Sequence, residues 1–442
     1  MRYVMWILQQ IGFTISFIYL WATSSINGMK SRSHPPALRF ENPYEGQKIL
    51  LVALYEKGLP RPDMQMLMRE AKDQGAYVLA VNTMRFTDPV AWQGLIDCYI
   101  EKHNFGRDFS SYQAGFLHLY SRGWEKTCPR VLMLNDSVFY CSQRTPRFIA
   151  DLFESEVEAM GATENFEIEH HVGSFCVAIA GRVVAHDRLQ RYWRDYRNTD
   201  LRPAVIRRGE MGLSKALKRT VASDGDFRAL YDVDRFSKRV RADEAFLARA
   251  LHHARDSSLV AWPTTRAKDV LRDFRTRFAI RDDANLSDEY LPRLEQGTIS
   301  IEQYVKLTRR DQPTLATGVD LKEASLVDLD DLIATATEPL DSASTGKVEA
   351  RIREMVADRL VANFVRGSHI HQNAASLLDL GLAIVKLDGM YRGMFSPADV
   401  RKICALLTPE DAVAIERLLL SRPYGEHNLR GLRRAAFRQG LL

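Results

Sequence analysis

Short apolar runs alternate with amphipathic segments over much of the first half of the chain. The runs at 48–55 (KILLVALY) and 76–81 (AYVLAV) predict two buried strands, and the segment 63–74 between them has helical spacing. The same pattern predicts further helices at 89–97 and 110–120, and further strands near Tyr99, at 130–134 and at 174–180. Strands that alternate with helices predict an α/β fold with a mostly parallel sheet flanked by helices.

The pattern changes after about Asp187, because nearly every later run has helical spacing and β-branched runs disappear. A polar stretch rich in Asp, Thr, Ser and Ala interrupts this helical region, and a short helix at 326–334 is an alternative within it. The sequence therefore predicts five parts, which are a hydrophobic N-terminal segment at 1–28, an α/β domain at 48–235, a helical extension at 236–308, a linker at 309–346 and a separate helical C-terminal module at 347–442.

The first apolar run, Tyr3 to Ala22, contains no acid or base. It has the length of about 20 residues that a bilayer-spanning helix needs. Lys30 and Arg32 follow it, which favours a cytoplasmic body by the positive-inside rule. We expect a membrane anchor or membrane-associated helix that holds the protein at the cytoplasmic face of the inner (plasma) membrane. The alternative is that Met29 is the natural start.

Charge and composition exclude several classes of protein. The 442 residues carry 61 Lys and Arg against 56 Asp and Glu, a net charge of +5 that does not require a nucleic-acid partner and suits anionic substrates or an anionic membrane. The five cysteines form no C-x-x-C pair, so neither a disulfide framework nor a thiolate zinc site is indicated. The chain also lacks the P-loop, Rossmann and H-E-x-x-H motifs, which argues against P-loop kinases, Rossmann dehydrogenases and zincins.

A first polar cluster, NFGRDFS at 104–110, follows a predicted strand and opens a predicted helix. Gly106 allows a close backbone approach, the helix N-terminus offers N–H groups to an anion, and Arg107 adds a positive charge. Open α/β sheets bind their ligands at the carboxyl ends of the strands, where this cluster is expected. The alternative is an ordinary helix cap formed by Asp108 or Ser110.

A second polar cluster, Asn135-Asp136-Ser137, comes directly after the strand at 130–134. An aspartate at the end of a buried strand is costly unless it faces a cleft. A carboxylate beside a hydroxyl there could hold Mg²⁺ or Mn²⁺ against a diphosphate. The alternative is an Asx turn that ends the strand.

The order of the motifs adds information. N-x-G-R-D-x-x-S-Y, a strand ending in L-N-D-S, H-x-x-S-F, and an isolated Glu before the amphipathic helix at 211–219 together resemble the rhamnan-synthesis F family of polysaccharide glycosyltransferases. The resemblance covers about residues 48–219. It implies a GT-A-like sheet and a nucleotide-sugar donor, with Asp136 as the counterpart of a metal-binding D-x-D aspartate.

The resemblance also implies roles for individual residues. Asn104, Gly106, Arg107 and Asp108 would lie near the donor nucleotide, and Asp136 would act at the diphosphate beside Asn135 and Ser137. His171, in H-x-x-S-F, would lie on the acceptor side, and Glu210 would be the general base. Position in the sequence suggests the rest of the expected donor site. Tyr55 and Asn82, at strand ends, would lie near the nucleobase. Arg207 and Arg208 would lie near the departing diphosphate and Glu210. The alternative for Glu210 is that it only favours a helix N-terminus.

These observations predict an inverting glycosyltransferase. It would move a sugar, L-rhamnose from dTDP-rhamnose in the first instance, onto a growing polysaccharide or lipid-linked glycan at the cell surface. The alternative is a non-catalytic scaffold that keeps the sheet and uses its helical C-terminal module to assemble a polysaccharide synthesis complex.

Overall fold

The computed structural model describes residues 2–254, 264–282, 296, 328–337 and 342–442. The described residues form two compact units. The first contains the sheet and comprises residues within 1–233 and 364–442, and the second is helical and comprises residues within 234–257 and 263–363.

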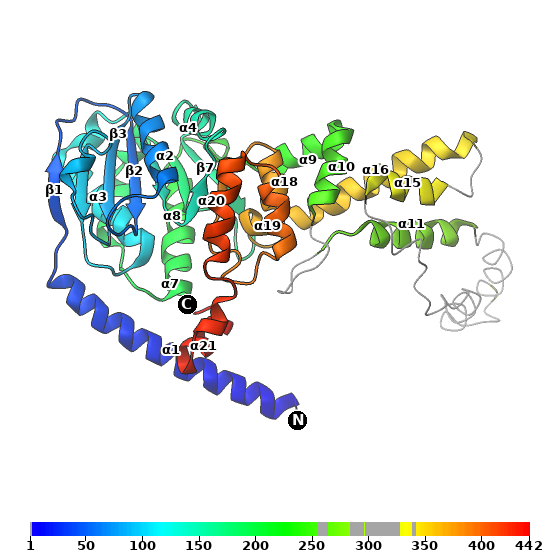
Figure 1. Cartoon of the computed structure of the whole chain (residues 1–442), viewed down its shortest axis with the longest axis horizontal. Coiled ribbons are helices and arrows are strands. Elements are labelled where there is room, and N and C mark those ends of the chain that lie inside the picture. Colours follow the sequence, from blue (N-terminus) through cyan, green and yellow to red (C-terminus); the bar gives the residue numbers. More distant parts are fainter. Residues whose placement is uncertain (1, 255–263, 283–295, 297–327, 338–341) are drawn as a thin grey trace. The chain divides into compact units, whose positions relative to one another are not determined.

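The first unit is built on a nine-stranded sheet (Figure 1). Its order is β1-β4-β3-β2-β5-β9-β7-β10, and β8 pairs with β7 outside this path. β2 to β5 pair in parallel, β9 runs antiparallel to both of its neighbours, and β10 is parallel to β7. The strands are β1 (Ala37–Glu41), β2 (Ile49–Leu54), β3 (Tyr77–Asn82), β4 (Cys98–Glu101), β5 (Arg130–Asn135), β7 (Ala159–Asn165), β8 (His171–Val172), β9 (Cys176–Ala180) and β10 (Phe227–Tyr231). The predicted α/β fold with a mostly parallel sheet is confirmed.

Helices cover both faces of this sheet. α3 (Arg107–Arg122) packs on β2 and β3, and α6 (Asp187–Asp195) and α8 (Met211–Lys218) continue the same layer. α2 (Pro62–Asp73) and α4 (Thr145–Phe153) cover the other face. Every residue of β2, β3 and β5 is buried, as continuous apolar runs covered on both faces require.

Most expected elements of the α/β region are present, and two kinds of difference stand out. The helix expected at 89–97 is only a single 3-10 turn, η1 (Val90–Trp92). The strands β1, β7, β8 and β10 were not expected, nor was the short strand β6 (Val138–Tyr140). β10 also shows that strands do not end at Asp187.

The C-terminal segment differs from the expected separate module, because residues 364–442 belong to the sheet-containing unit. β11 (Ile384–Lys386) pairs antiparallel with β6. A core of buried residues joins the two segments, including Phe139, Val385, Phe395 and Leu419. The helices of this segment are α17 (His369–Gln372), α18 (Ala374–Asp379), α19 (Pro397–Cys404), α20 (Pro409–Leu420) and α21 (Gly431–Arg438).

The second unit consists of helices in its described part. These are α9 (Val233–Ala242), α10 (Glu244–His253), α11 (Ala267–Asp282), α15 (Leu329–Thr337) and α16 (Ser342–Phe364). Ion pairs within it join α9 to α16 through Arg241 and Asp358 at 2.7 Å, and α16 to α11 through Arg359 and Asp273 at 2.7 Å. Most of the expected linker at 309–346 and the end of the helical extension lie outside the described residues. The short helix at 326–334 corresponds to α15.

α1 (Arg2–Arg32) is a single helix of the first unit, and polar side chains in its second half contact residues 199–200. Ser24 Oγ lies 3.2 Å from Thr199 Oγ1, and Asn27 Nδ2 donates to Asp200 Oδ2 at 2.9 Å. The large apolar side chains are exposed instead, and Trp21 is 57% exposed. Within the described residues, no helix is long and apolar enough to cross a bilayer.

Candidate functional site

A cleft of about 460 Å³ opens at the carboxyl edge of the sheet. It is lined by residues that follow β4 and β5, by the end of β7, and by the loop that enters β9. The remaining walls come from a helical segment at 202–218 and from residues 368–394 of the C-terminal segment. Because open α/β sheets bind ligands outside the carboxyl ends of their strands, this cleft is the candidate site.

An ion pair between Glu210 and His171 lies in the cleft. Glu210 Oε2 is 3.6 Å from His171 Nε2, and His171 Nδ1 lies 2.7 Å from the carbonyl oxygen of Glu169. Burial opposes the charge on both groups, but their mutual interaction raises the pKa of His171 and lowers the pKa of Glu210. Lys386 also helps to lower the pKa of Glu210. Glu210 is therefore an ionised carboxylate at neutral pH, which a general base requires.

Glu210 lies inside a continuous helical segment and not at a helix N-terminus. α7 (Arg202–Val205) continues into a π-helical turn, η3 (Ile206–Glu210), which continues into α8. The interpretation of Glu210 as an N-terminal residue that favours the helix dipole is therefore wrong. π-turns inside helices are rare and are frequent at functional sites. Gly209 is needed in this turn, because a Cβ there would lie 2.6 Å from the ring of Phe109.

The first predicted cluster places its basic residue in the cleft. Gly106 has φ +85°, and its N–H donates to Asp200 Oδ1 at 2.7 Å. Arg107 also has a positive φ, +52°, which is uncommon for a residue with a side chain and is often found at functional sites. Burial and the nearby Arg392 lower the pKa of Arg107. No ion pair within the described residues neutralises Arg107.

Asp108, Asn135 and Ser137 form one hydrogen-bonded chain. Asn135 Nδ2 donates to Asp108 Oδ2 at 2.8 Å, and Ser137 Oγ donates to Asn135 Oδ1 at 2.6 Å. Lys386 Nζ donates to Ser137 Oγ at 2.7 Å. Burial raises the pKa of Asp108. The two predicted clusters thus meet in one site, through Asn135.

Asp136 lies near the cleft but not among the residues that line it. Its carboxylate accepts the N–H of Tyr55, and this bond joins β5 to β2 at the point where the strand order reverses. The pKa of Asp136 is raised to about 7, because burial, and then the charges of Asp108 and Glu56, outweigh the lowering by the Tyr55 N–H and by Arg61. Burial raises the pKa of Glu56 to about 7 as well.

The surroundings of Asp136 do not form a metal site of three protein ligands. Within the described residues, Glu41, Cys98 and His118 are the group whose ligand atoms all lie within 4.8 Å of one another. These residues are on β1, β4 and α3, and Arg122 pairs with Glu41 at 3.0 Å. A divalent ion at Asp136 therefore stays a prediction.

Three predicted donor residues do not line the cleft. Tyr55 is 59% exposed, and only its backbone N–H bonds Asp136. Asn82 is fully buried and holds the turn after β3, because its side chain bonds the backbone of Glu56 and Met84. Asn104 accepts a hydrogen bond from Asn27 of α1 through its backbone oxygen. Asn82 and Asn104 thus have structural contacts where nucleotide contacts were expected.

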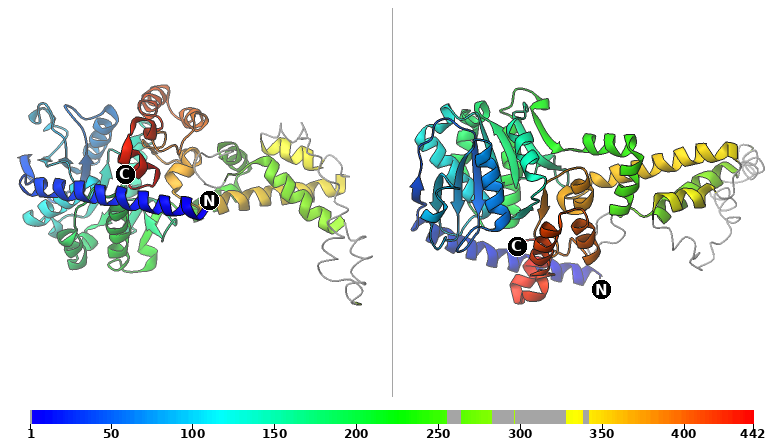
Figure 2. Two further views of the ribbon diagram at one scale, coloured as in Figure 1. Left: turned by 90° about the horizontal axis from the view of Figure 1, so that it is seen from below. Right: turned by 45° about the horizontal axis from the view of Figure 1, so that its top comes forward.

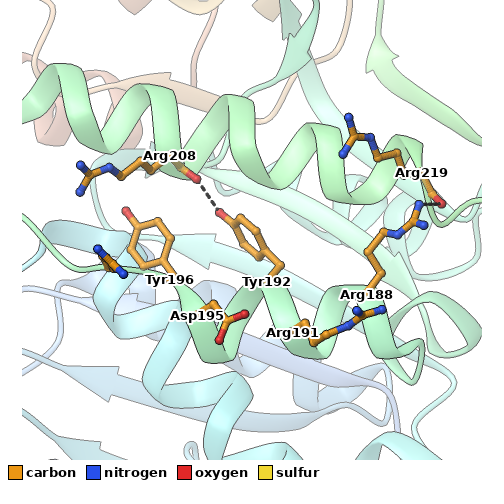
Figure 3. Close-up of a pocket in the computed structure, with 8 residues that line it drawn as sticks. Arg188, Arg191, Tyr192, Asp195, Tyr196, Arg208 and Arg219 are labelled. Atoms are coloured by element: carbon orange, nitrogen blue, oxygen red, sulfur yellow. Dashed lines mark hydrogen bonds between the residues drawn. The ribbon is translucent and has the colours of Figure 1, made fainter.

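Arg207 and Arg208 are exposed and do not line the cleft. Arg208 belongs instead to a second hollow, which α6 and the helical segment at 202–218 border (Figure 3). We call this hollow the arginine groove, and its arginines are Arg188, Arg191, Arg197, Arg208 and Arg219. The cations that line the cleft are Arg107, Arg202, Lys386 and Arg392.

The sequence analysis missed the contribution of the C-terminal segment. His371 Nε2 lies 2.7 Å from Asp388 Oδ1, and Arg392 Nε donates to Asp388 Oδ2 at 2.5 Å. Burial opposes the charge on Asp388, but His371, Lys386 and Arg392 bring its pKa well below the usual range. A signal was present, because Lys386-Leu387-Asp388 follows an apolar run just as Asn135-Asp136-Ser137 does.

No family model matches the chain. The chain is similar to an uncharacterized protein, y4gN, of Sinorhizobium fredii (strain NBRC 101917 / NGR234), with 31% identity over 121 residues. The matched part is 26% of this chain and 31% of that protein, so the chain spans about a third of the length of the relative that it matches.

Proposed function

We propose that the chain is a nucleotide-sugar-dependent glycosyltransferase with a GT-A-like sheet. The observation that carries the proposal is an ionised carboxylate, Glu210, in the same cleft as four cationic side chains, at the carboxyl edge of an open α/β sheet. Transfer to a hydroxyl needs a base for the acceptor and positive charge for the leaving diphosphate. Both are present within one cleft of about 460 Å³.

In the proposed reaction, the acceptor hydroxyl oxygen attacks the anomeric carbon of the donor sugar. Glu210 takes the hydroxyl proton as the new C–O bond forms. The bond from the anomeric carbon to the diphosphate breaks, and its electron pair leaves on the diphosphate oxygen. Arg107, Lys386 and Arg202 stabilise that charge. A single displacement of this kind inverts the anomeric configuration.

The first donor to test is dTDP-rhamnose, and the proposed acceptor is a growing surface polysaccharide or lipid-linked glycan. Thermal shift with nucleoside diphosphates, with and without Mg²⁺ or Mn²⁺, followed by a hydrolysis screen across nucleotide sugars, tests the donor. Ligand binding must raise the melting temperature. If no nucleotide does so at millimolar concentration, the scaffold alternative gains and the proposal fails.

We further propose that α1 lies on the cytoplasmic face of the inner membrane. Among its exposed apolar residues, Ile7, Ile11, Ile15 and Ile18 are three or four positions apart and share one face. Further exposed apolar side chains of α1 are Trp6, Phe13, Phe17, Trp21, Ile26 and Met29. The opposite face, with Ser16 and Ser24 buried, contacts the first unit. A helix with apolar residues outward and polar residues inward fits a lipid surface better than water.

The basic helix α21 lies alongside α1 (Figures 1 and 2) and adds Arg433 and Arg434 as exposed cations, which favour anionic lipids. Flotation with phosphatidylglycerol vesicles tests the membrane proposal. The double variant Ile11→Ser/Ile18→Ser should lose most vesicle binding, because both side chains are at least half exposed on the apolar face. Val413→Ser, another exposed apolar residue, is the matched control. Equal flotation of the parent and the double variant would contradict the proposal.

A further inference from the structure

The arginine groove has an unusual charge balance. Five exposed arginines border a hollow of about 620 Å³, and Asp195 is the acid that lines it. Within the described residues, none of these five guanidinium groups forms an ion pair. Like charges held around one hollow repel one another, and salt screens this repulsion only in part.

The arginines come from two consecutive elements that lie side by side around the hollow, and from the connection between them. Arg188 and Arg191 are on α6, and Arg208 and Arg219 border the helical segment at 202–218 (Figure 3). Two bonds hold the walls together, because Tyr192 donates to the carbonyl oxygen of Arg208 at 3.1 Å and Arg188 Nη1 donates to that of Arg219 at 2.6 Å. The groove is therefore a built feature of the fold.

A buried polar atom also lies at the groove. Tyr196 lines the groove and is 8% exposed, and its hydroxyl has no hydrogen-bond partner within the described residues. In Figure 3 this hydroxyl points toward Arg208. A buried hydroxyl without a partner is costly, and an incoming acceptor could satisfy it.

We propose that the arginine groove binds a ligand that carries at least two phosphate groups. Guanidinium groups bind phosphate oxygens in bidentate fashion. Such phosphates come from a soluble diphosphate or from a lipid headgroup. The inference does not depend on the glycosyltransferase proposal, because it uses none of the residues that line the cleft.

The test compares two triple variants of the full chain. Arg188→Gln/Arg191→Gln/Arg208→Gln removes three charges from the groove. Arg69→Gln/Arg401→Gln/Arg417→Gln removes three charges from exposed arginines elsewhere that likewise form no ion pair within the described residues. Both variants are made with Lys386→Met, which removes one cation of the cleft, and with Ile11→Ser/Ile18→Ser, which removes most of the vesicle binding proposed for α1. Circular dichroism checks that both fold.

Two assays then separate a soluble diphosphate from a lipid headgroup. One is calorimetric titration with pyrophosphate, and the other is flotation with vesicles of phosphatidylcholine that contain about 30% phosphatidic acid. We expect at least a tenfold loss of affinity in the groove variant and less than a twofold loss in the control, with binding that weakens as salt rises. Loss confined to pyrophosphate identifies a soluble ligand, and loss confined to vesicles identifies a lipid headgroup. Equal binding by both variants in both assays overturns the proposal.

Discussion

The cleft and the arginine groove share the helical segment at 202–218, but they differ in how many of their charged side chains form ion pairs. In the cleft, Glu210 is paired with His171, and Asp388 is paired with His371 and Arg392. In the groove, the arginines stay unpaired within the described residues. Paired, partly buried charges are held in place before a ligand arrives, whereas exposed unpaired charges attract a ligand from solution. The contrast supports the two proposals, which are chemistry in the cleft and ligand recognition in the groove.

The largest effect should come from the carboxylate of the cleft. Glu210→Gln keeps the shape of the side chain and removes its basicity, so turnover should fall on the order of a hundredfold or more while donor binding persists. Glu154→Gln, an exposed acid after α4, is the control and should keep full activity. Near-normal turnover, or a product with retained anomeric configuration, would rule out Glu210 as the base.

The paired charges of the cleft should also matter for stability. Arg392→Gln removes the ion pair with Asp388 and the bonds to the carbonyl oxygen of Leu442, so the free energy of unfolding should fall by about 2 kcal/mol. Urea denaturation measures this change. A loss below about 0.5 kcal/mol would mean that the ion pair of Arg392 and Asp388 stabilises the fold no more than an exposed surface ion pair does.

A third prediction concerns pH and Asp136. Burial first, and then Asp108 and Glu56, raise its pKa to about 7, so the folded state holds this proton more tightly than the unfolded state does. Stability should therefore fall as pH rises from about 4 through about 7. Asp136→Asn keeps an acceptor for the Tyr55 N–H and removes the titration, so its melting temperature should decline less between pH 5 and pH 8.

The same variant tests the predicted divalent ion. If Asp136 helps to hold Mg²⁺ with the donor, the ion should raise the melting temperature of the parent at pH 8 in the presence of nucleotide and leave Asp136→Asn unchanged. An identical response in both proteins would remove the ion from Asp136 and leave the pH prediction intact.

The smallest effect should come from the groove. Arg191→Gln removes an exposed charge without an ion pair, so the free energy of unfolding should change by less than about 0.5 kcal/mol in either direction. Urea denaturation beside Arg392→Gln makes the comparison direct. A loss near that of Arg392→Gln would show that the groove charges are structural.

The sequence was sufficient where local pattern decides the structure. β2, β3 and β5 are continuous apolar runs, and α2 and α3 have clear helical spacing, so all five could be predicted. β7 (AMGATEN) was not predicted because Ala, Gly, Glu and Asn are depleted in strands, although six of its seven residues are buried. Pairing with β9 and β10 on its two sides holds this segment in the sheet, although its composition does not favour a strand.

Half of the candidate site could be predicted in the same way. Arg107, Asp108 and Ser137 lie at strand ends or helix starts, where ligand sites are expected, and Glu210 and His171 came from the family resemblance. Lys386 could not be placed, because its contact with Ser137 spans 249 positions of sequence. Arg207 and Arg208 were wrongly assigned to the cleft. Which face of their helical segment points to the cleft depends on tertiary packing, which the sequence pattern does not give.

The pairing of β6 with β11 sets an order of events during synthesis. β6 ends at Tyr140 and β11 begins at Ile384, so the ribosome adds roughly 240 residues before the two strands can meet, which at about 5–20 residues per second takes on the order of 10–50 s. Throughout that time the nascent chain lacks Lys386, Asp388 and Arg392. The cleft is therefore completed last, and a chain released early would lack three of the charged residues that line it.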